Sequence, residues 1–305
     1  MSRVMVVGSY NICPTIRVER LPVLGESVLG ESVEWLHGGK GANQAIGLAR
    51  LGCDVGFICA VGQDTWGEGL KELLEREGLS KAGVITVDRD TGMAFIFVDN
   101  IGSNEIVIVP SANDALSTSI VVESFESELK KAEFVLMQLE CSDELVKGLV
   151  PLLQSWGVRI ILNPAPFRDV GWEVVRAVDF LTPNETELMA LARSLELSIV
   201  GDCVVEKVAT ELVQRGAKNI VVTLGDKGAL WVSEKGSVLV NSFDVPVIDT
   251  TGAGDAFNAG FVCGLLKGYS VEESVELGCK AGAFCVGRSG VMDGLGRFEE
   301  VIKIN

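Results

Sequence analysis

The chain has few basic residues and no long apolar run, and each shortage removes a class of function. It carries 26 Lys and Arg residues against 42 Asp and Glu residues, so its formal net charge is −16. This balance excludes nucleic-acid binding, because phosphate backbones are neutralised by clustered Lys and Arg. It does not exclude a nucleotide ligand, which needs only one local site. No stretch approaches the ~18 uninterrupted apolar residues of a membrane span, which argues against a membrane protein.

The eight cysteines and the single histidine, His37, lack the spacing of a zinc site. No CxxC pair occurs, and free cysteines usually behave as small buried apolar side chains. We therefore expect reduced thiols, with a thermophile-type intracellular disulfide as the open alternative. The apolar run that ends at Gly8 is too short for a signal peptide and is typical of a first strand. These features predict a cytoplasmic protein.

Strand-like and helix-like segments alternate along most of the chain, which predicts an α/β fold. Beyond residue 130, strand-like runs lie at 134–139, 159–162, 179–182 and 219–224, helix-like segments at 143–155, 184–194, 202–215, 256–266 and 271–287, and a hairpin at 228–243. Alternation of this kind predicts one domain over residues 1–305, with a doubly wound, mostly parallel sheet flanked by helices. Two strand-rich segments, about 12–36 and 91–110, break the pattern. They predict a small separate β-sheet that lies as a lid over one end of the main sheet.

Polar residues and glycines follow the predicted strands or open the predicted helices. These positions are Asn11, residues 38–43, Glu140, Asn163, Asn184, Gly225 and Asp255. Ligands of open α/β sheets bind outside the carboxyl ends of the strands. The shared placement of these residues therefore favours an enzyme site.

Residues 249–257 are the stretch with the most chemistry. They follow a strand-like run at 245–248 and open the predicted helix at 256–266, with Gly252, Ala253 and Gly254 in the turn. The free backbone amides of a helix start can hold a phosphate. Asp255 would repel a resting phosphate, so its presence favours a proton-handling role beside amides that hold charge on a moving phosphoryl group. The alternative is that Asp255 simply caps the helix.

Two familiar nucleotide motifs fail in this chain. A P-loop reading of Gly39-Lys40 fails because positions 34 and 41 hold Glu34 and Gly41. A dinucleotide fingerprint that starts at Gly252 fails because its third glycine position holds Phe257. Neither P-loop nor Rossmann cofactor binding is predicted.

Three further motifs each allow a functional and a plain interpretation. Residues 38–44 can bind hydroxyls through Lys40 and Asn43, or can form a glycine-rich turn before a helix. Residues 184–187 can be a capping box, or Glu187 can hold water around a Mg²⁺ ion bound to phosphates. Residues 223–228 can be a hairpin turn or a surface under an adenine ring.

Together these motifs resemble the ribokinase-like carbohydrate kinase family over essentially the whole chain. The matching segments, in order, are 38–44 (GGKGANQ), 137–140 (MQLE), 163–166 (NPAP), 182–187 (TPNETE), 223–225 (TLG) and 249–255 (DTTGAGD). The resemblance implies an ATP-dependent kinase that phosphorylates the primary hydroxyl of a pentose, with ribose, giving ribose 5-phosphate, as the first choice. It also implies a lid that forms the contact of a homodimer.

The resemblance assigns roles residue by residue. Asp255 would be the base, and the amides of Gly252, Ala253 and Gly254 would form the anion hole. The sugar would be held by Asn11, Cys13, Gly39, Lys40, Asn43, Glu140 and Asp255. ATP would lie along Asn184, Thr223, Gly225, Gly228 and Gly254, with Glu187 near Mg²⁺ through water. A loop for a monovalent cation, typically K⁺, would use Asp249 and Thr251 with the carbonyls of Cys285, Arg288 and Gly290.

Two positions depart from the family pattern and bear on the substrate. The family carries Asp two residues after the equivalent of Asn11, where it grips sugar hydroxyls, and this chain has Cys13 there. A thiol is a weak hydrogen-bonding group, so a deoxysugar, another sugar or a nucleoside becomes an alternative to ribose. Gly294 replaces a serine near the end of the cation loop. A nucleoside kinase, a ketohexose kinase and a non-catalytic sugar-binding regulator on the same fold remain the alternative functions.

Overall fold

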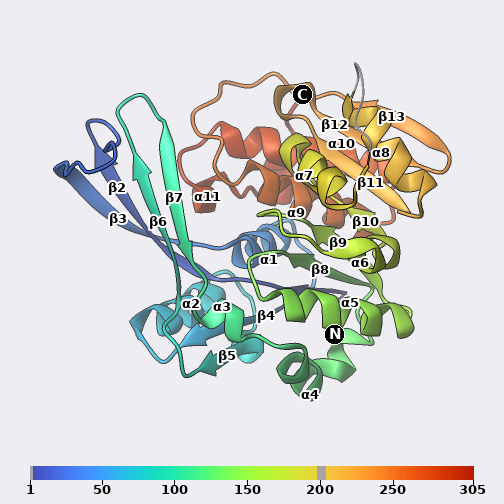
Figure 1. Ribbon diagram of the computed structural model, residues 1–305, viewed down its shortest axis with the longest axis horizontal. Coiled ribbons are helices and arrows are strands. Elements are labelled where there is room, and N and C mark those ends of the chain that lie inside the picture. Colours follow the sequence, from blue (N-terminus) through green and yellow to red (C-terminus); the bar gives the residue numbers. More distant parts are fainter. Residues whose placement is uncertain (1–2, 198–203) are drawn as a thin grey trace.

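The computed structural model describes residues 3–197 and 204–305, and within them nine strands form a central sheet (Figure 1). In spatial order the strands are β13 (Gly236–Val240), β12 (Ala229–Ser233), β11 (Asn219–Thr223), β10 (Phe180–Leu181), β9 (Arg159–Asn163), β8 (Phe134–Gln138), β1 (Val4–Val7), β4 (Val55–Gly62) and β5 (Val84–Val87). Strands β11 to β5 are parallel, and β11, β12 and β13 form the antiparallel end of the sheet. The predicted mostly parallel sheet is confirmed.

Strand β1 lies between β4 and β8, at the point where the order of the strands along the chain reverses. Val4 pairs with Val55 on one side and with Phe134 on the other, and every residue of β1 is buried. After β1 the chain moves outward through β4 and β5, and it then returns to β8 on the opposite side of β1. Such a reversal opens a crevice outside the carboxyl ends of the strands, where ligands of doubly wound sheets bind.

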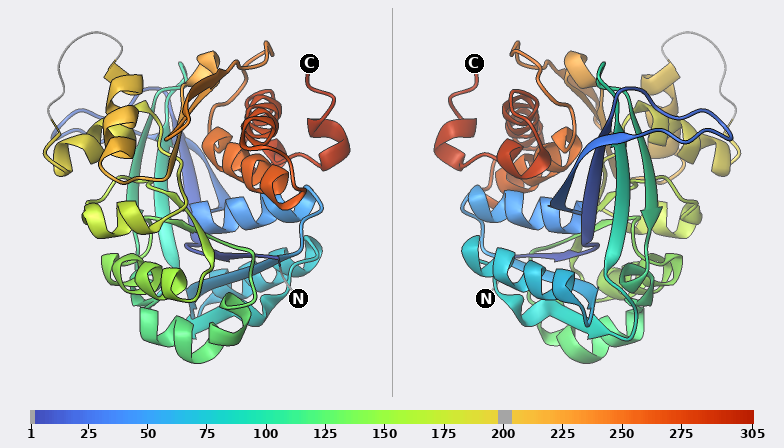
Figure 2. Two further views of the ribbon diagram at one scale, coloured as in Figure 1. Left: turned by 90° about the vertical axis from the view of Figure 1, so that its right-hand side faces the viewer. Right: turned by 90° about the vertical axis from the view of Figure 1, so that its left-hand side faces the viewer.

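Helices cover both faces of the sheet (Figure 2). One layer consists of α1 (Lys40–Arg50), α2 (Thr65–Arg76), α9 (Ala253–Leu266), α10 (Val271–Val286) and α12 (Phe298–Val301), with the short α11 (Val291–Gly294) beside α9. The other consists of α3 (Ala112–Ala115), α4 (Thr118–Leu129), α5 (Asp143–Ser155), α6 (Gly171–Ala177), α7 (Glu185–Ser194) and α8 (Val204–Gln214). Each layer buries its own apolar cluster against the sheet, so the strands read as continuous apolar runs.

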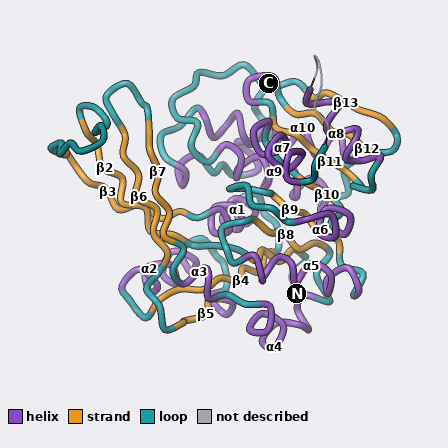
Figure 3. The backbone as a smooth tube through the Cα atoms, viewed as in Figure 1, coloured by secondary structure: helices purple, strands orange, loops and turns teal. Residues whose placement is uncertain are grey.

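A second sheet projects from the carboxyl-end side of the main sheet, as the lid prediction expected. Its order is β3 (Gly30–Gly38), β2 (Asn11–Val18), β6 (Gly92–Val98) and β7 (Asn104–Val109). Figures 1 and 3 show these four strands extending together away from the helical layers. Asp64 anchors the base of the lid, because its carboxylate accepts hydrogen bonds from the backbone N–H and the hydroxyl of Thr91 at 2.7 Å each.

Several element boundaries differ from the sequence predictions. Residues 245–248 were predicted as a strand but form a loop in which Val247 and Ile248 are exposed; Pro246 has no N–H for a ladder, and the amide of Ile248 bonds instead to the carbonyl of Val286. Helix α9 begins at Ala253 rather than 256, so Asp255 lies within its first turn. Helices α4 and α6 were not predicted.

No helix among the described residues combines the length and the apolar character that a membrane crossing requires.

Candidate active site

The reversal point of the main sheet holds a buried carboxylate, Glu140, just beyond β8. Ser9, which follows β1, donates its hydroxyl to Glu140 Oε2 at 2.5 Å, and the backbone amide of Lys40 donates to the same oxygen at 2.8 Å. Gly41 permits this approach, since a Cβ there would lie 2.5 Å from the backbone nitrogen of Ser9. Two strand ends and the start of α1 are thereby fixed around one carboxylate.

Asp255 is buried and is held by two neighbouring side chains of α1. Asn43 Nδ2 donates to Asp255 Oδ2 and Gln44 Nε2 donates to Asp255 Oδ1, both at 2.8 Å. The residue is 5% exposed, and the N-cap position of α9 is held by Gly252 rather than by Asp255. The interpretation of Asp255 as a simple helix cap is therefore wrong. Its carboxylate is turned toward α1 and the site.

The turn before Asp255 is shaped by glycine at two positions for different reasons. Gly252 has φ +84°, a left-handed conformation that glycine adopts without strain. Gly254 has no such φ, and a Cβ built there would meet nothing within 4 Å. Neither packing nor backbone conformation therefore requires glycine at position 254. The open space beside the helix start is what a ligand phosphate would occupy.

Lys40 lies among three carboxylates and links the parts of the site. Burial lowers its pKa, but Asp255, Glu140 and Glu187 raise it, and the net direction is upward. Glu187 itself has a raised pKa, caused first by burial and opposed by the Asn184 amide and by Lys40. The ammonium group therefore stays charged between the Glu140 and Glu187 sides of the crevice.

Asn11 and Cys13 bring the lid to the edge of this crevice on β2. Asn11 Oδ1 accepts a hydrogen bond from Asn113 Nδ2 at 2.9 Å, and the Cys13 thiol lies 3.9 Å from the carbonyl oxygen of Asn11. Gly38 pairs with Asn11 in the ladder and lies against the Cys13 side chain, since a Cβ on Gly38 would be 2.6 Å from the sulfur. Burial, followed by the charge of Glu140, raises the pKa of Cys13 to about 12. Cys13 therefore presents a neutral thiol at this edge of the crevice.

Apart from Gly254 in α9, the residues predicted for ATP lie just beyond or near the ends of β10 and β11. Asn184 and Thr223 form a parallel bridge, and the amide of Thr223 donates to the carbonyl of Pro183 at 3.0 Å. Asn184 and Glu187 form the capping box of α7, with bonds of 2.8 and 2.9 Å, so the plain interpretation of that motif holds whatever else Glu187 does. Gly228 has φ +96° and lies against the carbonyl of Val240.

The predicted cation loop is brought together around Asp249. Its two oxygens accept backbone hydrogen bonds from Thr251 and Gly290 at 2.9 Å each. Burial raises the pKa of Asp249, but these hydrogen bonds together lower it by more, so the pKa lies below its usual value. The Cys285 thiol lies 3.6 Å from the carbonyl of Thr251, and Arg288 bonds through its backbone amide to the carbonyl of Cys285. A Cβ at Gly294 would lie 2.6 Å from the Cys285 sulfur, which accounts for the missing serine at that position.

The donor sets differ in how they fit a metal. Across residues 3–197 and 204–305, no group of three or more His, Cys, Asp or Glu side chains could hold an ion by itself. A single carboxylate such as Glu187 is enough for a Mg²⁺ ion that is held mainly by nucleotide phosphates and water. The loop around Asp249 offers one carboxylate and backbone carbonyls, the hard oxygen donors that a K⁺ ion would need.

Two residues of the site were missed from the sequence, Ser9 and Gln44. Ser9 follows β1, and Gln44 lies beside Asn43 in the same motif. Their positions, at the end of a strand and near the start of a helix, were the sequence features that could have identified them. Their partners are 131 and 211 residues away along the chain, and no local pattern identifies such partners.

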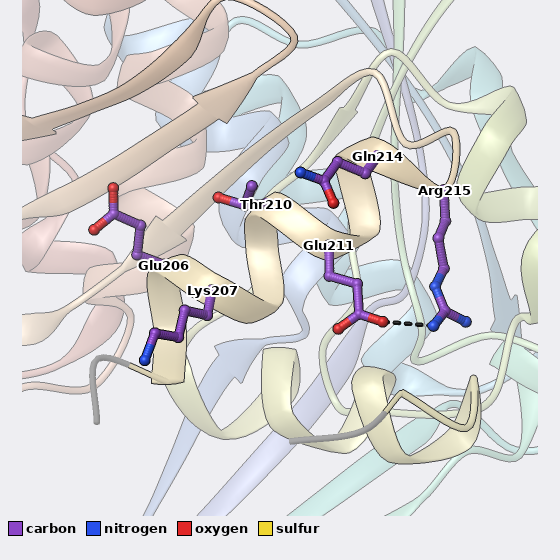
Figure 4. A pocket seen from close by; sticks show the side chains of 6 residues that line it. All are labelled: Glu206, Lys207, Thr210, Glu211, Gln214 and Arg215. Carbon is purple, nitrogen blue, oxygen red and sulfur yellow. Dashed lines mark hydrogen bonds and ion pairs between the residues drawn. The ribbon is translucent and has the colours of Figure 1, made fainter. Parts of the chain in front are cut away.

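A surface hollow of about 690 Å³ lies elsewhere, along α8 (Figure 4). Its lining residues come from that helix and from the residue directly after it, and they are Glu206, Lys207, Thr210, Glu211, Gln214 and Arg215. Glu211 and Arg215, which are four residues apart, form an ion pair at 2.5 Å. Figure 4 marks this pair with a dashed line. None of the predicted site residues lines this hollow.

The whole chain is similar to known carbohydrate kinases. The model of the pfkB family of carbohydrate kinases matches residues 1–296. A ribokinase of Haemophilus influenzae is 36% identical over 98% of this chain and 96% of its own length. A deoxyribokinase of Salmonella typhi is 32% identical over 99% of each.

Solved structures agree with this similarity. A ribokinase of Thermotoga maritima superimposes with a TM-score of 0.91 at 34% identity, over 99% of this chain and 98% of that one. An Arabidopsis thaliana ribokinase, solved in complex with ribose and ATP, gives a TM-score of 0.87 at 29% identity over the same shares of the two chains.

Proposed function

The chain belongs to the pfkB family of carbohydrate kinases and is an ATP-dependent sugar kinase; we propose that it transfers the γ-phosphoryl group of ATP to the primary hydroxyl of ribose. The observation that carries this proposal is the buried Asp255 carboxylate, held by Asn43 and Gln44 beside the open glycine turn at the start of α9. The ribokinase relatives support ribose as the acceptor.

In the proposed reaction Asp255 takes the proton from the primary hydroxyl of the sugar. The hydroxyl oxygen then forms a bond to the γ-phosphorus, and the bond from that phosphorus to the β,γ-bridging oxygen breaks, so that ADP leaves. The amides of Gly252, Ala253 and Gly254 stabilise the charge of the moving phosphoryl group, and Asp255 afterwards returns its proton to solvent. Phosphoryl transfer depends mainly on such positioning and charge stabilisation.

The remaining residues hold the two substrates on either side of this point. Glu140, Lys40 and the lid residue Asn11 bind sugar hydroxyls, together with Gly39, Asn43 and Cys13. Asn184, Thr223, Gly225 and Gly228 lie along ATP. Asn43 Oδ1 supports this assignment, because it is buried without a hydrogen-bond partner and can accept from a hydroxyl.

Two metal ions belong to the proposal. Mg²⁺ would neutralise the nucleotide phosphates, with Glu187 holding its water. K⁺ would sit in the loop of Asp249 and Thr251 with the carbonyls of Cys285, Arg288 and Gly290, and would steady the turn that leads to Gly252. Use of ATP supports a cytoplasmic location.

One observation favours a second acceptor, 2-deoxyribose. Cys13 presents a neutral thiol at the position where the family's carboxylate would bind sugar hydroxyls. Loss of a ligand hydroxyl costs little against a weak hydrogen-bonding group. The deoxyribokinase relative is consistent with such an acceptor.

The experiment that tests the function is a substrate panel with ATP and Mg²⁺, with and without K⁺. Formation of ADP is measured with ribose, 2-deoxyribose, fructose and nucleosides. Asp255→Asn should lower kcat by about 10²- to 10⁴-fold, the usual range for a general base, and the exposed Asp143→Asn should leave it unchanged. Inert ribose beside an active nucleoside or fructose would overturn the acceptor, and no turnover with any acceptor would favour a sugar-binding regulator.

The lid also supports a homodimer. Val33 on β3 and Ile106, Val107 and Val109 on the edge strand β7 are about half exposed. An exposed apolar edge strand pairs readily with another strand, and a second copy of the lid offers one. Size-exclusion chromatography with light scattering should report a dimer. Val107→Lys should weaken this dimer, and the control Ile302→Lys, at an exposed apolar residue far from the lid in sequence, should not. A wild-type monomer would refute the assembly.

A further inference from the structure

Gln44 occupies the centre of a buried row of polar side chains beneath Asp255. Its Nε2 donates both to Asp255 Oδ1 at 2.8 Å and to Asn163 Oδ1 at 3.1 Å. Its Oε1 accepts from Gln138 Nε2 at 2.6 Å. The residue is fully buried, so none of these bonds exchanges readily with water.

The row continues from Asn163 and returns to the residue before Asp255. Asn163 Nδ2 donates to the carbonyl of Thr182, and the hydroxyl of Thr182 donates to Asn258 Oδ1, at 2.9 and 2.6 Å. Asn258 Nδ2 then donates to the carbonyl of Gly254 at 2.8 Å. The hydrogen bonds therefore form a closed ring that starts at the carboxylate of Asp255 and ends one residue earlier in α9.

The chemistry of the groups leaves one arrangement for the ring. An ionised carboxylate only accepts hydrogen bonds, so Gln44 must turn its NH₂ toward Asp255 and its oxygen toward Gln138. Asn163, Thr182 and Asn258 then donate in sequence in one direction. Gln44 supplies the ring's link to the carboxylate.

We propose that Gln44 is a positioning residue of the kinase reaction, acting through Asp255 without touching sugar or nucleotide. It holds Oδ1 in the ring and leaves Oδ2, on the Asn43 side, to receive the proton of the sugar hydroxyl. The ring fixes that oxygen relative to Gly254, so the base and the phosphate-binding turn keep one geometry. This inference rests on the proposed function, since it concerns the same transfer.

The test separates positioning from binding and from folding. Gln44→Met keeps the length of the side chain but removes the amide, and Gln44→Asn keeps an amide but withdraws it from Asp255 by one methylene. Each should lower kcat on the order of 10²-fold, because small misplacements of a reacting group cost that much. The KM values and the calorimetric Kd for the sugar should stay within about threefold, as expected for a residue that stabilises only the transition state. Gln154→Met, on the exposed face of α5, is the matched control and should behave as wild type.

A second comparison asks whether Gln44 works through the base. In an Asp255→Asn background, single-turnover transfer from radiolabelled ATP should fall less than about twofold when Gln44→Met is added, because residues that act as a unit are not additive. Either of two results would overturn the proposal: kcat of both single variants within about threefold of wild type, or an undiminished loss in the Asp255→Asn background. The wild-type rate with ribose in the same assay tests the proposed function separately.

Discussion

Replacing Cys13 by aspartate should turn a permissive sugar site into one that demands a hydroxyl. The thiol is almost fully buried, and its pKa of about 12 keeps it neutral throughout any assay range. Gly38 faces it without a side chain, so the slightly larger carboxylate of Cys13→Asp has a glycine as its neighbour. The new group would lie in the field of the Glu140 carboxylate.

The size of the effect follows from the hydrogen bond that the carboxylate adds. A hydrogen bond to a charged group contributes about 1.5–3 kcal/mol, which corresponds to about 10- to 100-fold in kcat/KM. Only ribose carries the 2-hydroxyl, so the ratio of kcat/KM for ribose over 2-deoxyribose should rise by that factor. In the wild type the same ratio should stay within about tenfold, since a thiol discriminates weakly.

The assay measures ADP formation with both sugars for the wild type, Cys13→Asp and Cys13→Asn. The asparagine variant has nearly the same shape as aspartate but no charge, so it should change the ratio much less. Thermal unfolding of all three proteins checks that the buried carboxylate is tolerated. If Cys13→Asp is folded and its ratio of kcat/KM for ribose over 2-deoxyribose stays within threefold of the wild-type ratio, Cys13 does not contact the sugar and the prediction is refuted.

Two further predictions concern the turn before Asp255 and the loop beside it. Gly254→Ala should fold like the wild type, because its Cβ meets nothing within 4 Å. It should nevertheless lower kcat/KM for ATP by about 10- to 100-fold, because the methyl group enters the space proposed for the phosphate. Gly282→Ala, whose Cβ would make ordinary contacts, is the control, and normal ATP kinetics for Gly254→Ala would contradict the proposed anion hole. Asp249→Asn should lower Tm at neutral pH, because the pKa of Asp249 is depressed in the folded protein. A carboxyl group with a depressed pKa stabilises the fold above its unfolded pKa of about 4, and this stabilisation is lost as the pH falls through the folded pKa. The Tm difference between wild type and variant should therefore disappear in acid, and a difference that stays constant with pH would contradict an electrostatic cause.

The order of strands and helices was predictable where local patterns are strong. Helix α5 begins and ends at the predicted residues, and α10 begins at the predicted residue and ends one residue before the predicted end. Helix α4 escaped prediction because its run of Ile120, Val121 and Val122 is β-branched and typical of a strand, and only a few of its residues are buried. The tertiary packing of α4 against α5 decides its structure.

The predicted start of α9 was three residues too late because the first turn of the helix contains a glycine. Glycine is a poor helix former, so a helix start at 256 was the better choice on propensity alone. The structure instead begins α9 at Ala253 and places Gly254 inside its first turn. Under the proposed function Gly254 leaves room for a ligand phosphate, and propensity rules do not contain a requirement of that kind.

The pairings within the site set the limit of what one sequence can predict. Local rules place Ser9, Glu140 and Asn163 near strand ends, and the parallel topology brings all strand ends to one edge, so the neighbourhood follows from the pattern. The bonds themselves join Ser9 to Glu140 and Gln44 to Asp255 across 131 and 211 residues, and each depends on the spatial order of strands that β1 organises. A sheet with the same strands in another order would keep every motif and lose every one of these bonds. The chemistry of the kinase therefore resides in the topology as much as in its motifs, and the ring through Gln44 is the part of the site where topology contributes most.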